Sequence, residues 1–343
     1  MNETKYRLHN GDGWRLDVRR FSDPESLNPR RRPVVLVPGY CMNCFILGFH
    51  PGGETSLIES LVDEGLEVWA ANMRGQGDSR RLGGKKRYGF ADLALTDLTS
   101  IIDFILDKTD CAPGGDRVDL IGCSLGATVS YVYLAHRPDD HSVGALVNIG
   151  GPLRWNRAHP GLRFASRFSP LLGRLPIKGT RRMARMAIPF ARRFPWILSH
   201  YMNPDIIDLS CAADIVQTID DPDPKLNRQI AEWIKGRDLV VQGLNISHSL
   251  YSVDVPIQCI IAMQDGIVTP EAALSVLDHI GSHEINIVEV GTPEVPHAHA
   301  DLFISEGVEH KVFRPLLRWL ASQADSGGEG RDEQEEPADA GAR

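Results

Sequence analysis

The chain has no long hydrophobic run. No apolar stretch approaches the roughly 18 to 20 residues that a helix needs to cross a bilayer. The polar residues 1–7 also lack the apolar character of a signal peptide. These absences predict a chain that neither spans a membrane nor begins with a secretion signal.

Cysteine is sparse and scattered. The six cysteines stand at positions 41, 44, 111, 123, 211 and 259, and only Cys41 and Cys44 form a close pair. That pair has no second pair and no histidine at the spacing of a zinc ligand set. Scattered thiols are typical of a reducing compartment. We therefore expect a cytoplasmic protein without a disulfide framework, a metal or a cofactor.

Acidic residues are missing from one segment. Residues 151–204 contain eleven Arg or Lys and no Asp or Glu, whereas the last 21 residues contain seven acids and two arginines. Subtracting +11 and −5 from the formal net charge of −8 leaves −14 for the rest of the chain. Segments of opposite charge usually have different roles. The overall acidity and the lack of a recognition motif argue against nucleic-acid binding.

Strand and helix patterns alternate along most of the 343 residues. An alternating apolar and polar run at 14–21 follows a Gly-Asp-Gly turn and predicts a β-hairpin with residues 5–10. A continuous apolar run at 33–39 predicts a strand covered on both faces, and 66–72 predicts a second buried strand. Further strand patterns lie at 118–121, 143–149, 255–262 and 284–290. Helical patterns lie at 55–63, 92–108, 127–137, after Thr269, and at 306–322. The alternation predicts an α/β fold with a mostly parallel central sheet, helices on both faces and an antiparallel hairpin at one edge.

The alternation stops in the middle of the chain. Residues 153–253 contain several short helical patterns separated by prolines, from Pro160 to Pro204. We therefore divide the chain into a core at 1–152 and 254–322, an inserted basic helical cap at 153–253, and an acidic tail at 323–343. The tail is rich in Gly, Asp and Glu with hardly any apolar residue, which predicts disorder.

One serine stands between two glycines, in Gly122-Cys-Ser-Leu-Gly126. A strand pattern precedes this run and a small-residue helix pattern follows it, which is the context of a nucleophile elbow. Such a turn lifts the serine hydroxyl above the sheet at a helix N-terminus, where N–H groups favour a developing negative charge. We predict that Ser124 is a nucleophile. Cys123 should point toward the packing layer as a small buried residue.

A serine nucleophile needs a histidine base and a carboxylate that orients the histidine. In a fold of this kind the order along the chain is Ser, acid, His, each on a loop after a strand. Asp265 follows the strand pattern at 255–262 and is the predicted acid. The loop after 284–290 holds His297 and His299, and position alone leaves both as candidates for the base.

Several motifs together resemble the α/β-hydrolase superfamily. They are Val-Pro-Gly-Tyr40, Asn-Met-Arg-Gly-Gln-Gly-Asp at 72–78, the run around Ser124, Asp265-Gly-Ile-Val, and His299-Ala-Asp-Leu-Phe303. Residues 90–97 and 101–104 and the His299-x-Asp301 ending are similar to the acid-lipase branch, which favours His299 over His297. The likeness covers 1–152 and 254–322. The helix pattern at 57–65 is also similar to polyhydroxyalkanoate synthases, but those carry cysteine where Ser124 stands.

The resemblance implies an oxyanion hole made by two backbone N–H groups. By motif these belong to Leu125 and Tyr40, with Cys41 as the alternative to Tyr40. Pro38 stands where the family often has histidine, and Ala262 stands where the acid loop commonly has glycine. Backbone donors tolerate both changes.

The basic segment interleaves its positive charges with aromatic residues and methionines. In 180–194 an apolar helical stripe, with a kink expected at Pro189, is formed by Met183, Met186, Ala187, Phe190 and Phe194. This composition fits contact with a membrane surface or anionic lipid, or a lid that admits an acyl chain or an anionic acyl-CoA. The alternative is a solvated cap whose arginines pair with the acidic core domain.

These features predict a serine hydrolase that cleaves carboxylic esters with an apolar acyl group, like an esterase or lipase. Ser124, Asp265 and His299 would act through an acyl-enzyme. An acyltransferase or thioesterase, polyhydroxyalkanoate-related enzymes included, would use the same triad. The remaining alternative is a catalytically silent binding protein of the same fold, although such proteins usually lack one triad member.

Overall fold

The computed structural model describes residues 1–85, 87–111, 116–174, 176–194 and 198–325. Within them one large sheet has the strand order β1-β2-β4-β3-β6-β7-β10-β11, and β5 pairs with β2. Its strands are β1 (Asn2–His9), β2 (Trp14–Ser22), β3 (Val34–Val37), β4 (Val68–Asn72), β5 (Arg80–Arg81), β6 (Val118–Cys123), β7 (Val143–Ile149), β10 (Ile257–Ala262) and β11 (Ile285–Val290).

The sheet is mostly parallel. Every neighbouring pair from β4 to β11 is parallel, whereas β2 is antiparallel to both β1 and β4. The central strands β3, β4 and β6 are buried along their whole length, because both faces of the sheet are covered and continuous apolar runs fill them. The predicted fold class is confirmed.

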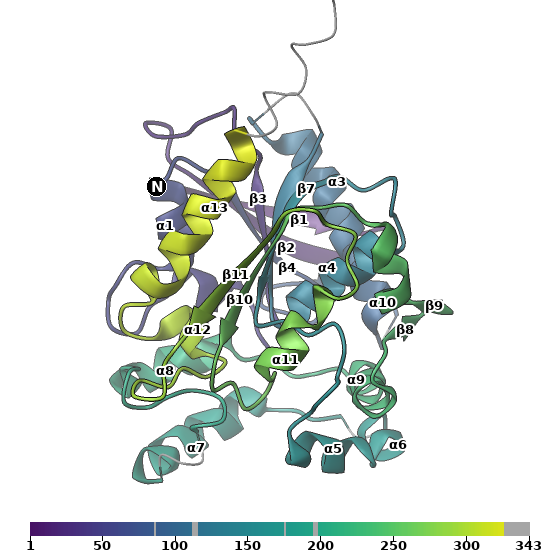
Figure 1. The fold of residues 1–343 in the computed structure, drawn as a ribbon, viewed down its shortest axis with the longest axis vertical. Helices are drawn as coiled ribbons and strands as arrows, with labels where there is room; N and C mark the ends of the chain where they lie inside the picture. The colour runs from purple at the N-terminus through teal and green to yellow at the C-terminus, as the bar shows by residue number, and fades with distance from the viewer. Residues whose placement is uncertain (86, 112–115, 175, 195–197, 326–343) are drawn as a thin grey trace, which may run out of the picture.

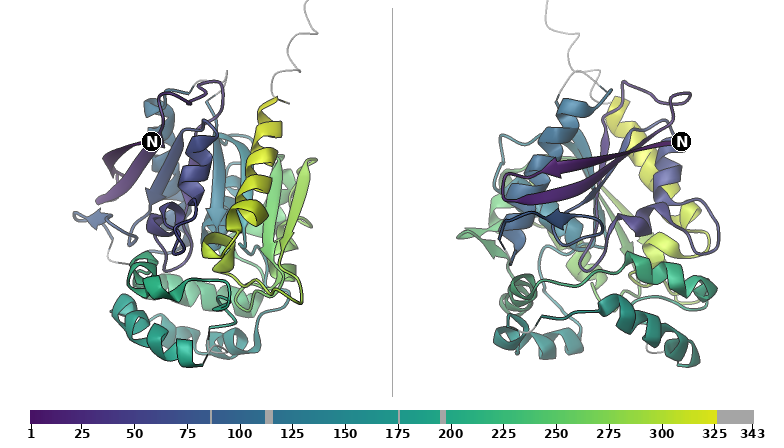
Figure 2. Two further views of the ribbon diagram at one scale, coloured as in Figure 1. Left: turned by 90° about the vertical axis from the view of Figure 1, so that its left-hand side faces the viewer. Right: turned by 180° about the vertical axis from the view of Figure 1, so that it is seen from behind.

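Helices cover the two faces of the sheet (Figures 1 and 2). One apolar cluster joins the sheet to α1 (Leu57–Asp63), α12 (Asp301–Ile304) and α13 (Arg314–Asp325). A second cluster on the other face joins it to α2 (Phe90–Asp92), α3 (Thr99–Lys108), α4 (Leu125–Ala135), α10 (Ile246–Ser249) and α11 (Pro270–Ala273). A π-helical stretch, Leu93–Leu98, connects α2 to α3.

Several predicted helix boundaries were wrong by two or three residues. The helix predicted at 55–63 begins at Leu57, the one predicted at 92–108 begins at Phe90, and the last helical segment begins at Glu309 and not at residue 306. Helix α4 begins at Leu125 rather than at residue 127, because the turn at Ser124 leads directly into it.

The last helix continues to Asp325, so residues 323–325 belong to it and not to the tail. The backbone carbonyl of Gln323 accepts a hydrogen bond from Arg32, which holds this end of α13 to the core. The rest of the predicted tail, 326–343, lies outside the described residues.

The insertion between β7 and β10 lies over the carboxyl ends of the parallel strands, at the bottom of Figure 1. Its helices are α5 (Pro160–Ser166), α6 (Ser169–Leu172), α7 (Thr180–Arg193), α8 (Ala212–Ile215) and α9 (Pro224–Gly236), followed by a hairpin of β8 (Val240–Val241) and β9 (Leu244–Asn245). Helix α10, which we assigned to the cap, packs on α4 instead. Its Ile246 and the following Leu250 are fully buried in the apolar cluster that contains α4.

Candidate active site

Ser124 occupies a strained turn between β6 and α4. Its backbone angles, φ 52° and ψ −120°, lie in a region that residues other than glycine rarely adopt. The two flanking glycines permit close packing here. A Cβ on Gly122 would lie 2.4 Å from the Cα of Ala127, and one on Gly126 would lie 2.1 Å from the carbonyl oxygen of Val37. Side chains at either position would force the turn away from the sheet.

Three side chains from separate loops meet at this turn. Nε2 of His299 lies 2.8 Å from Oγ of Ser124, and Nδ1 of His299 lies 2.5 Å from Oδ2 of Asp265. Asp265 follows β10, and its Oδ1 accepts hydrogen bonds from the backbone N–H groups of Ile267 and Val268, each at 2.8 Å. Ser124, Asp265 and His299 are all buried. The structure therefore brings the three predicted residues together in the expected order.

The surroundings of His299 favour its protonated form. Burial by itself lowers the pKa of His299, but the carboxylate of Asp265 raises it, and the resulting pKa lies above the ordinary histidine value. When Nδ1 donates its proton to Asp265, the lone pair of Nε2 faces the serine hydroxyl. This arrangement can take a proton from Ser124 and hold it.

His297 lies outside this cluster. Its Nδ1 is 3.0 Å from the carbonyl oxygen of Val295, and its Nε2 is 3.2 Å from Nζ of Lys311. Burial lowers the pKa of His297. Of the two candidate histidines, His299 is the one placed beside Ser124.

Asp301 has contacts for which the sequence provides no signal beyond the family resemblance. Its buried carboxylate accepts hydrogen bonds from the backbone N–H of Ala298 at 2.6 Å and of Asn203 at 3.0 Å. Beside it, the N–H of Ala300 donates to the carbonyl of Tyr201 at 2.8 Å. Burial raises the pKa of Asp301 to about 7. These contacts tie the loop that carries His299 to the cap segment around residues 201–203.

The loop after β3 packs against the serine turn. A Cβ on Gly39 would lie 2.9 Å from the carbonyl oxygen of Cys123 and 2.9 Å from Cβ of Ser124. Tyr40, Leu125 and Ser124 line one cavity. Among the described residues, the backbone N–H groups of Tyr40, Cys41 and Leu125 donate to no protein acceptor. They are the two predicted donors, Tyr40 and Leu125, and Cys41, the alternative to Tyr40.

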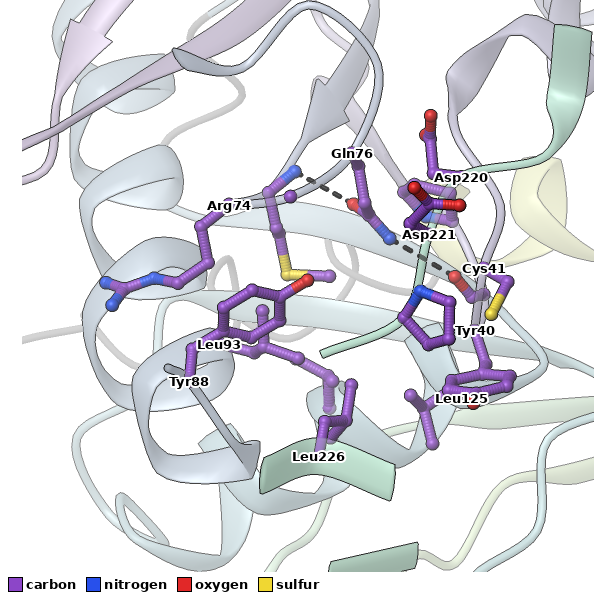
Figure 3. A pocket seen from close by; sticks show the side chains of 16 residues that line it. Tyr40, Cys41, Arg74, Gln76, Tyr88, Leu93, Leu125, Asp220, Asp221 and Leu226 are labelled. Carbon is purple, nitrogen blue, oxygen red and sulfur yellow. Dashed lines mark hydrogen bonds between the residues drawn. The ribbon is translucent and has the colours of Figure 1, made fainter. Parts of the chain in front are cut away.

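Gln76 holds this loop in place, as Figure 3 shows. Its Nε2 donates to the carbonyl oxygen of Gly39 at 3.2 Å, and its Oε1 accepts from the N–H of Met73 at 2.9 Å. The carbonyl of Gly39 and the N–H of Tyr40 belong to one planar trans peptide and point in opposite directions. The N–H of Met42 donates to the same carbonyl at 3.3 Å. Gln76 and Met42 thereby set the direction of the Tyr40 N–H together. Gln76 lies in the 72–78 motif, but its partner could not be read from the sequence.

A cavity of about 400 Å³ lies between the sheet and the cap, with Ser124 and His299 in its wall. Trp155 and Trp233 meet edge to face in this wall, with ring centroids 5.5 Å apart. Among the described residues no Asp or Glu lines it. Most of the lining is apolar, from Met42, Leu125, Pro152, Trp155, Leu162, Ile219, Ile230, Trp233, Ile234, Ile267 and Val268. The site is suited to an apolar group of a substrate.

The nearby thiols are poor competitors for Ser124. Cys123 is fully buried, and burial raises the pKa of its thiol far above the ordinary range. Burial also raises the pKa of Cys41 to about 12. The thiolate is the reactive form of cysteine, so neither side chain is activated. Within the described part of the chain, no group of three or more His, Cys, Asp or Glu is arranged to hold a metal ion.

Fold and sequence comparisons agree on the class of protein. The sheet, the strained serine turn and the loops that meet there define the α/β-hydrolase fold. A family model described as serine aminopeptidase, S33, matches residues 29–291. The chain belongs to this family. The resemblance inferred from the motifs is confirmed.

The sequence relatives include several lipases. Lipase member N of Mus musculus is 31% identical over 146 residues, which are 39% of this chain and 35% of that protein. Gastric triacylglycerol lipase of Homo sapiens is 28% identical over 143 residues, which are 39% of this chain and 35% of that protein. The chain thus spans about a third of the length of these curated relatives.

Solved structures share the fold over nearly the whole chain. A thermophilic esterase from Thermogutta terrifontis superposes with a TM-score of 0.59 at 17% identity, covering 94% of this chain and 100% of its own. A monoacylglycerol lipase from Paleococcus ferrophilus gives 0.57 at 20% identity, covering 90% of this chain and 99% of its own. Within the described residues, no helix has the length and apolar character needed to cross a membrane.

Proposed function

We propose that this protein is a serine hydrolase that cleaves carboxylic esters with an apolar acyl group. One observation carries the proposal. Ser124 contacts His299, His299 contacts Asp265, and this chain of contacts lies in the wall of an apolar cavity. Ser124 acts as nucleophile, His299 as general base and then general acid, and Asp265 as the group that orients His299.

Acylation begins when Oγ of Ser124 attacks the ester carbonyl carbon and its proton passes to Nε2 of His299. The tetrahedral oxyanion accepts hydrogen bonds from the backbone N–H groups of Leu125 and Tyr40. Collapse of this intermediate breaks the bond to the alcohol oxygen, and His299 returns the proton to that oxygen. The alcohol leaves, and the acyl group stays on Ser124.

Deacylation repeats these steps with water. His299 takes a proton from water as the water oxygen attacks the acyl carbon, and the same N–H groups hold the second oxyanion. The bond to Oγ of Ser124 then breaks, and His299 returns the proton to Oγ. A carboxylic acid is released, and the free enzyme is restored.

The lining of the cavity supports an ester substrate over a peptide with a free amino terminus. A buried ammonium group needs an anionic or strongly polar partner. Among the described residues the cavity contains no Asp or Glu, and Asp265 is held by His299 and two backbone N–H groups. Apolar acyl groups match the aliphatic and tryptophan side chains that remain.

Labelling with a fluorophosphonate probe tests the proposal, because such probes react with an activated serine. We expect stoichiometric labelling of the folded protein and no adduct in Ser124→Ala. Ester hydrolysis should disappear in the same variant. Absence of an adduct on the folded wild-type chain, or an adduct that persists in Ser124→Ala, would exclude the triad and leave a silent binding protein as the better reading.

An acyltransferase or thioesterase would use the same acyl-enzyme and differ in what attacks it. Turnover of acyl-CoA with and without an added alcohol separates the three activities. We expect an ester hydrolase to release free acid from esters faster than from acyl-CoA. Transfer of the acyl group to the alcohol in preference to water would instead indicate an acyltransferase.

The cavity also supports a preference for longer acyl groups. A series of chromogenic esters from acetyl to palmitoyl would measure it. We expect kcat/KM to increase beyond the shortest chains, since each buried methylene contributes about 0.8 kcal/mol. A preference for the acetyl and butyryl esters would show that the cavity does not receive the acyl chain.

We place the protein in the cytoplasm as part of this proposal. All six cysteines are free thiols, and Cys44, Cys111, Cys123 and Cys259 are buried in reduced form. A reducing compartment keeps such thiols intact. Fractionation of cells that produce the protein would test this, and recovery outside the cytoplasm would contradict it.

A further inference from the structure

The outermost layer of the cap consists of α5, α6 and α7. Figures 1 and 2 place these helices at the end of the molecule, farther from the sheet than α8 and α9. Large apolar side chains are exposed there, with Met186 at 72% and Phe164 at 60%. We use the term outer cap face for these three helices together with the described residues that connect them. Its exposed apolar residues are Phe164, Phe168, Leu171, Ile177, Met183 and Met186. Exposed apolar groups gathered on one side commonly mark a contact site.

The same layer carries cations without partners. Among the described residues, no Asp or Glu lies in ion-pair contact with Arg163, Arg167, Arg174, Lys178, Arg182 or Arg185, and all six are exposed. Other basic residues of the segment do have partners, since Arg154 pairs with Asp238 and Arg181 with Asp220. The solvated-cap alternative required the arginines to pair with acidic residues. The six exposed cations do not meet that requirement.

The two sides of α7 differ in what they contact. Successive helical residues are about 100° apart, so Arg182, Met183, Arg185 and Met186 fall within about 160° of the circumference. All four are exposed. The opposite side holds Ala184, which packs against the core cluster, and Arg181, which bonds to Asp220 and to the carbonyl of Ile219. The outward side therefore mixes cations with flexible apolar side chains.

Helix α5 belongs to the outer cap face and also borders the candidate active site. Leu162 lines the cavity that contains Ser124, whereas Phe164, two residues further on, is exposed and packs edge to face against Phe168 at 5.4 Å. The inner side of this short helix therefore faces the cavity, and its outer side faces the surroundings.

We propose that the outer cap face docks onto an anionic phospholipid surface. Arginines and Lys178 would bind headgroup phosphates, and the phenylalanine and methionine side chains would enter the boundary with the acyl chains. The charge distribution favours one orientation. The formal net charge is −8, and residues 151–204 contribute +11, so the rest of the chain carries −19. An anionic surface attracts the cap and repels the remainder.

This orientation places α5 between the bilayer and the cavity. Docking does not depend on the catalytic proposal, because it uses none of the residues around Ser124. It adds to that proposal a source of substrate, since an ester lipid in the bilayer would lie next to the helix that lines the cavity.

Vesicle co-sedimentation tests the inference with the full chain. The probes are vesicles of phosphatidylcholine alone and of phosphatidylcholine mixed with phosphatidylglycerol, at low and high salt. We expect binding to the mixed vesicles only, weakened by salt because exposed charges are screened. The test variant combines Arg163→Gln, Arg182→Gln and Arg185→Gln. Each basic residue near an anionic surface is worth about fivefold in affinity, so the variant should bind on the order of 100-fold more weakly.

A matched control removes the same charge elsewhere. Arg30, Arg80 and Arg117 are exposed and, like the cap cations, have no acidic partner among the described residues. The triple change of these three residues to Gln should leave vesicle binding unchanged. A second variant, Met183→Ser with Met186→Ser, should bind more weakly and lose the residual binding that persists at high salt.

Three outcomes would overturn the inference. They are equal binding to neutral and anionic vesicles, no binding to either, and binding that survives the loss of the three cap arginines. Sedimentation velocity without vesicles adds a further check. A dimer that the cap variant dissociates, together with absent vesicle binding, would assign the face to a second copy of the chain. Fluorophosphonate labelling and hydrolysis of a short soluble ester should be unchanged in all these variants, which keeps this test separate from that of the proposed function.

Discussion

At the scale of single residues, backbone conformation positions the reacting groups of the site. Ser124 holds an unfavourable conformation at a cost of about 1–3 kcal/mol, and close packing of its flanking glycines keeps it there. The Tyr40 N–H has its direction set through the Gly39 carbonyl, which Gln76 holds. The geometry for attack is therefore prepared before a substrate binds.

Replacing Gln76 with Ala should lower kcat about 10- to 100-fold with little change in KM, because an oxyanion donor acts mainly in the transition state. Gln76→Glu should lose nearly as much, since it keeps the acceptor for Met73 but lacks the donor for Gly39. Steady-state kinetics with a soluble ester would measure both. Gln217→Ala, a change at an exposed glutamine, serves as the control. A rise in KM with unchanged kcat would contradict the assigned role.

The activity of the wild-type protein should fall as the pH drops through the pKa of His299. A protonated imidazole cannot accept the proton of Ser124, so kcat/KM is lost on the acid side. Asp265 raises this pKa, and the midpoint should therefore lie above 6.5. Asp265→Asn should move the midpoint downward and lower kcat by about 10⁴, because an amide favours the wrong tautomer. Asp205→Asn, at an exposed position, should change neither quantity.

At the scale of elements, the cap and the catalytic loops are held by a few polar contacts. The Tyr40 hydroxyl donates to Oδ1 of Asn227 on α9 at 2.5 Å, and Lys225 on the same helix lies 2.8 Å from Asp92 on α2. Asp301 connects the loop of His299 to Asn203 in the cap. Displacement of the cap would therefore disturb the site without any change at Ser124.

Asp301→Ala should reduce both stability and kcat. The change leaves the N–H groups of Ala298 and Asn203 without their acceptor, at roughly 1–3 kcal/mol for each buried donor. The loop of His299 loses its tie to the cap, so kcat should fall more than KM rises. Thermal melts and kinetics below the melting range would measure the two effects. Asp205→Ala is the matched control, and unchanged kcat in a destabilised Asp301→Ala would reduce the role of Asp301 to stability alone.

At the scale of the whole molecule, core and cap share one apolar cluster. Trp155, Leu226, Trp233 and Ile234 of the insertion belong to the same cluster as residues of β3, β6 and α4. The insertion is therefore packed into the fold, although its outer layer is exposed. We expect this packing to make the two parts unfold as one cooperative unit.

Calorimetry should accordingly show a single unfolding transition for the whole chain, with equal calorimetric and van't Hoff enthalpies. Tryptophan fluorescence, which reports both the core and the cap, and far-ultraviolet circular dichroism should give the same midpoint. Two separate transitions in either signal would contradict unfolding as a single unit.

Much of the architecture could be predicted because local sequence patterns specify it. The buried strands at β3 and β4, the hairpin of β1 and β2, and the turn at Ser124 each follow from residues that are neighbours in the chain. The three side chains around that turn were predictable too, since each lies just after a strand of one parallel sheet. Errors occurred where burial decided the outcome, as at α10, which packs on α4 instead of joining the cap.

The amino-acid order alone determined the α/β fold and the identity of Ser124, Asp265 and the pair of histidines, because short-range periodicity and motif context specify them. Position along the chain left both histidines open, the family resemblance favoured His299, and the tertiary structure placed His299 beside Ser124. Only the tertiary structure assigned Gln76 and Asp301 their contacts and left the six cap cations without acidic partners among the described residues. Those outcomes depend on distances between segments up to 175 residues apart, such as Ser124 and His299. Such distances are set by how the helices and loops pack around the sheet. Local sequence patterns do not specify this packing.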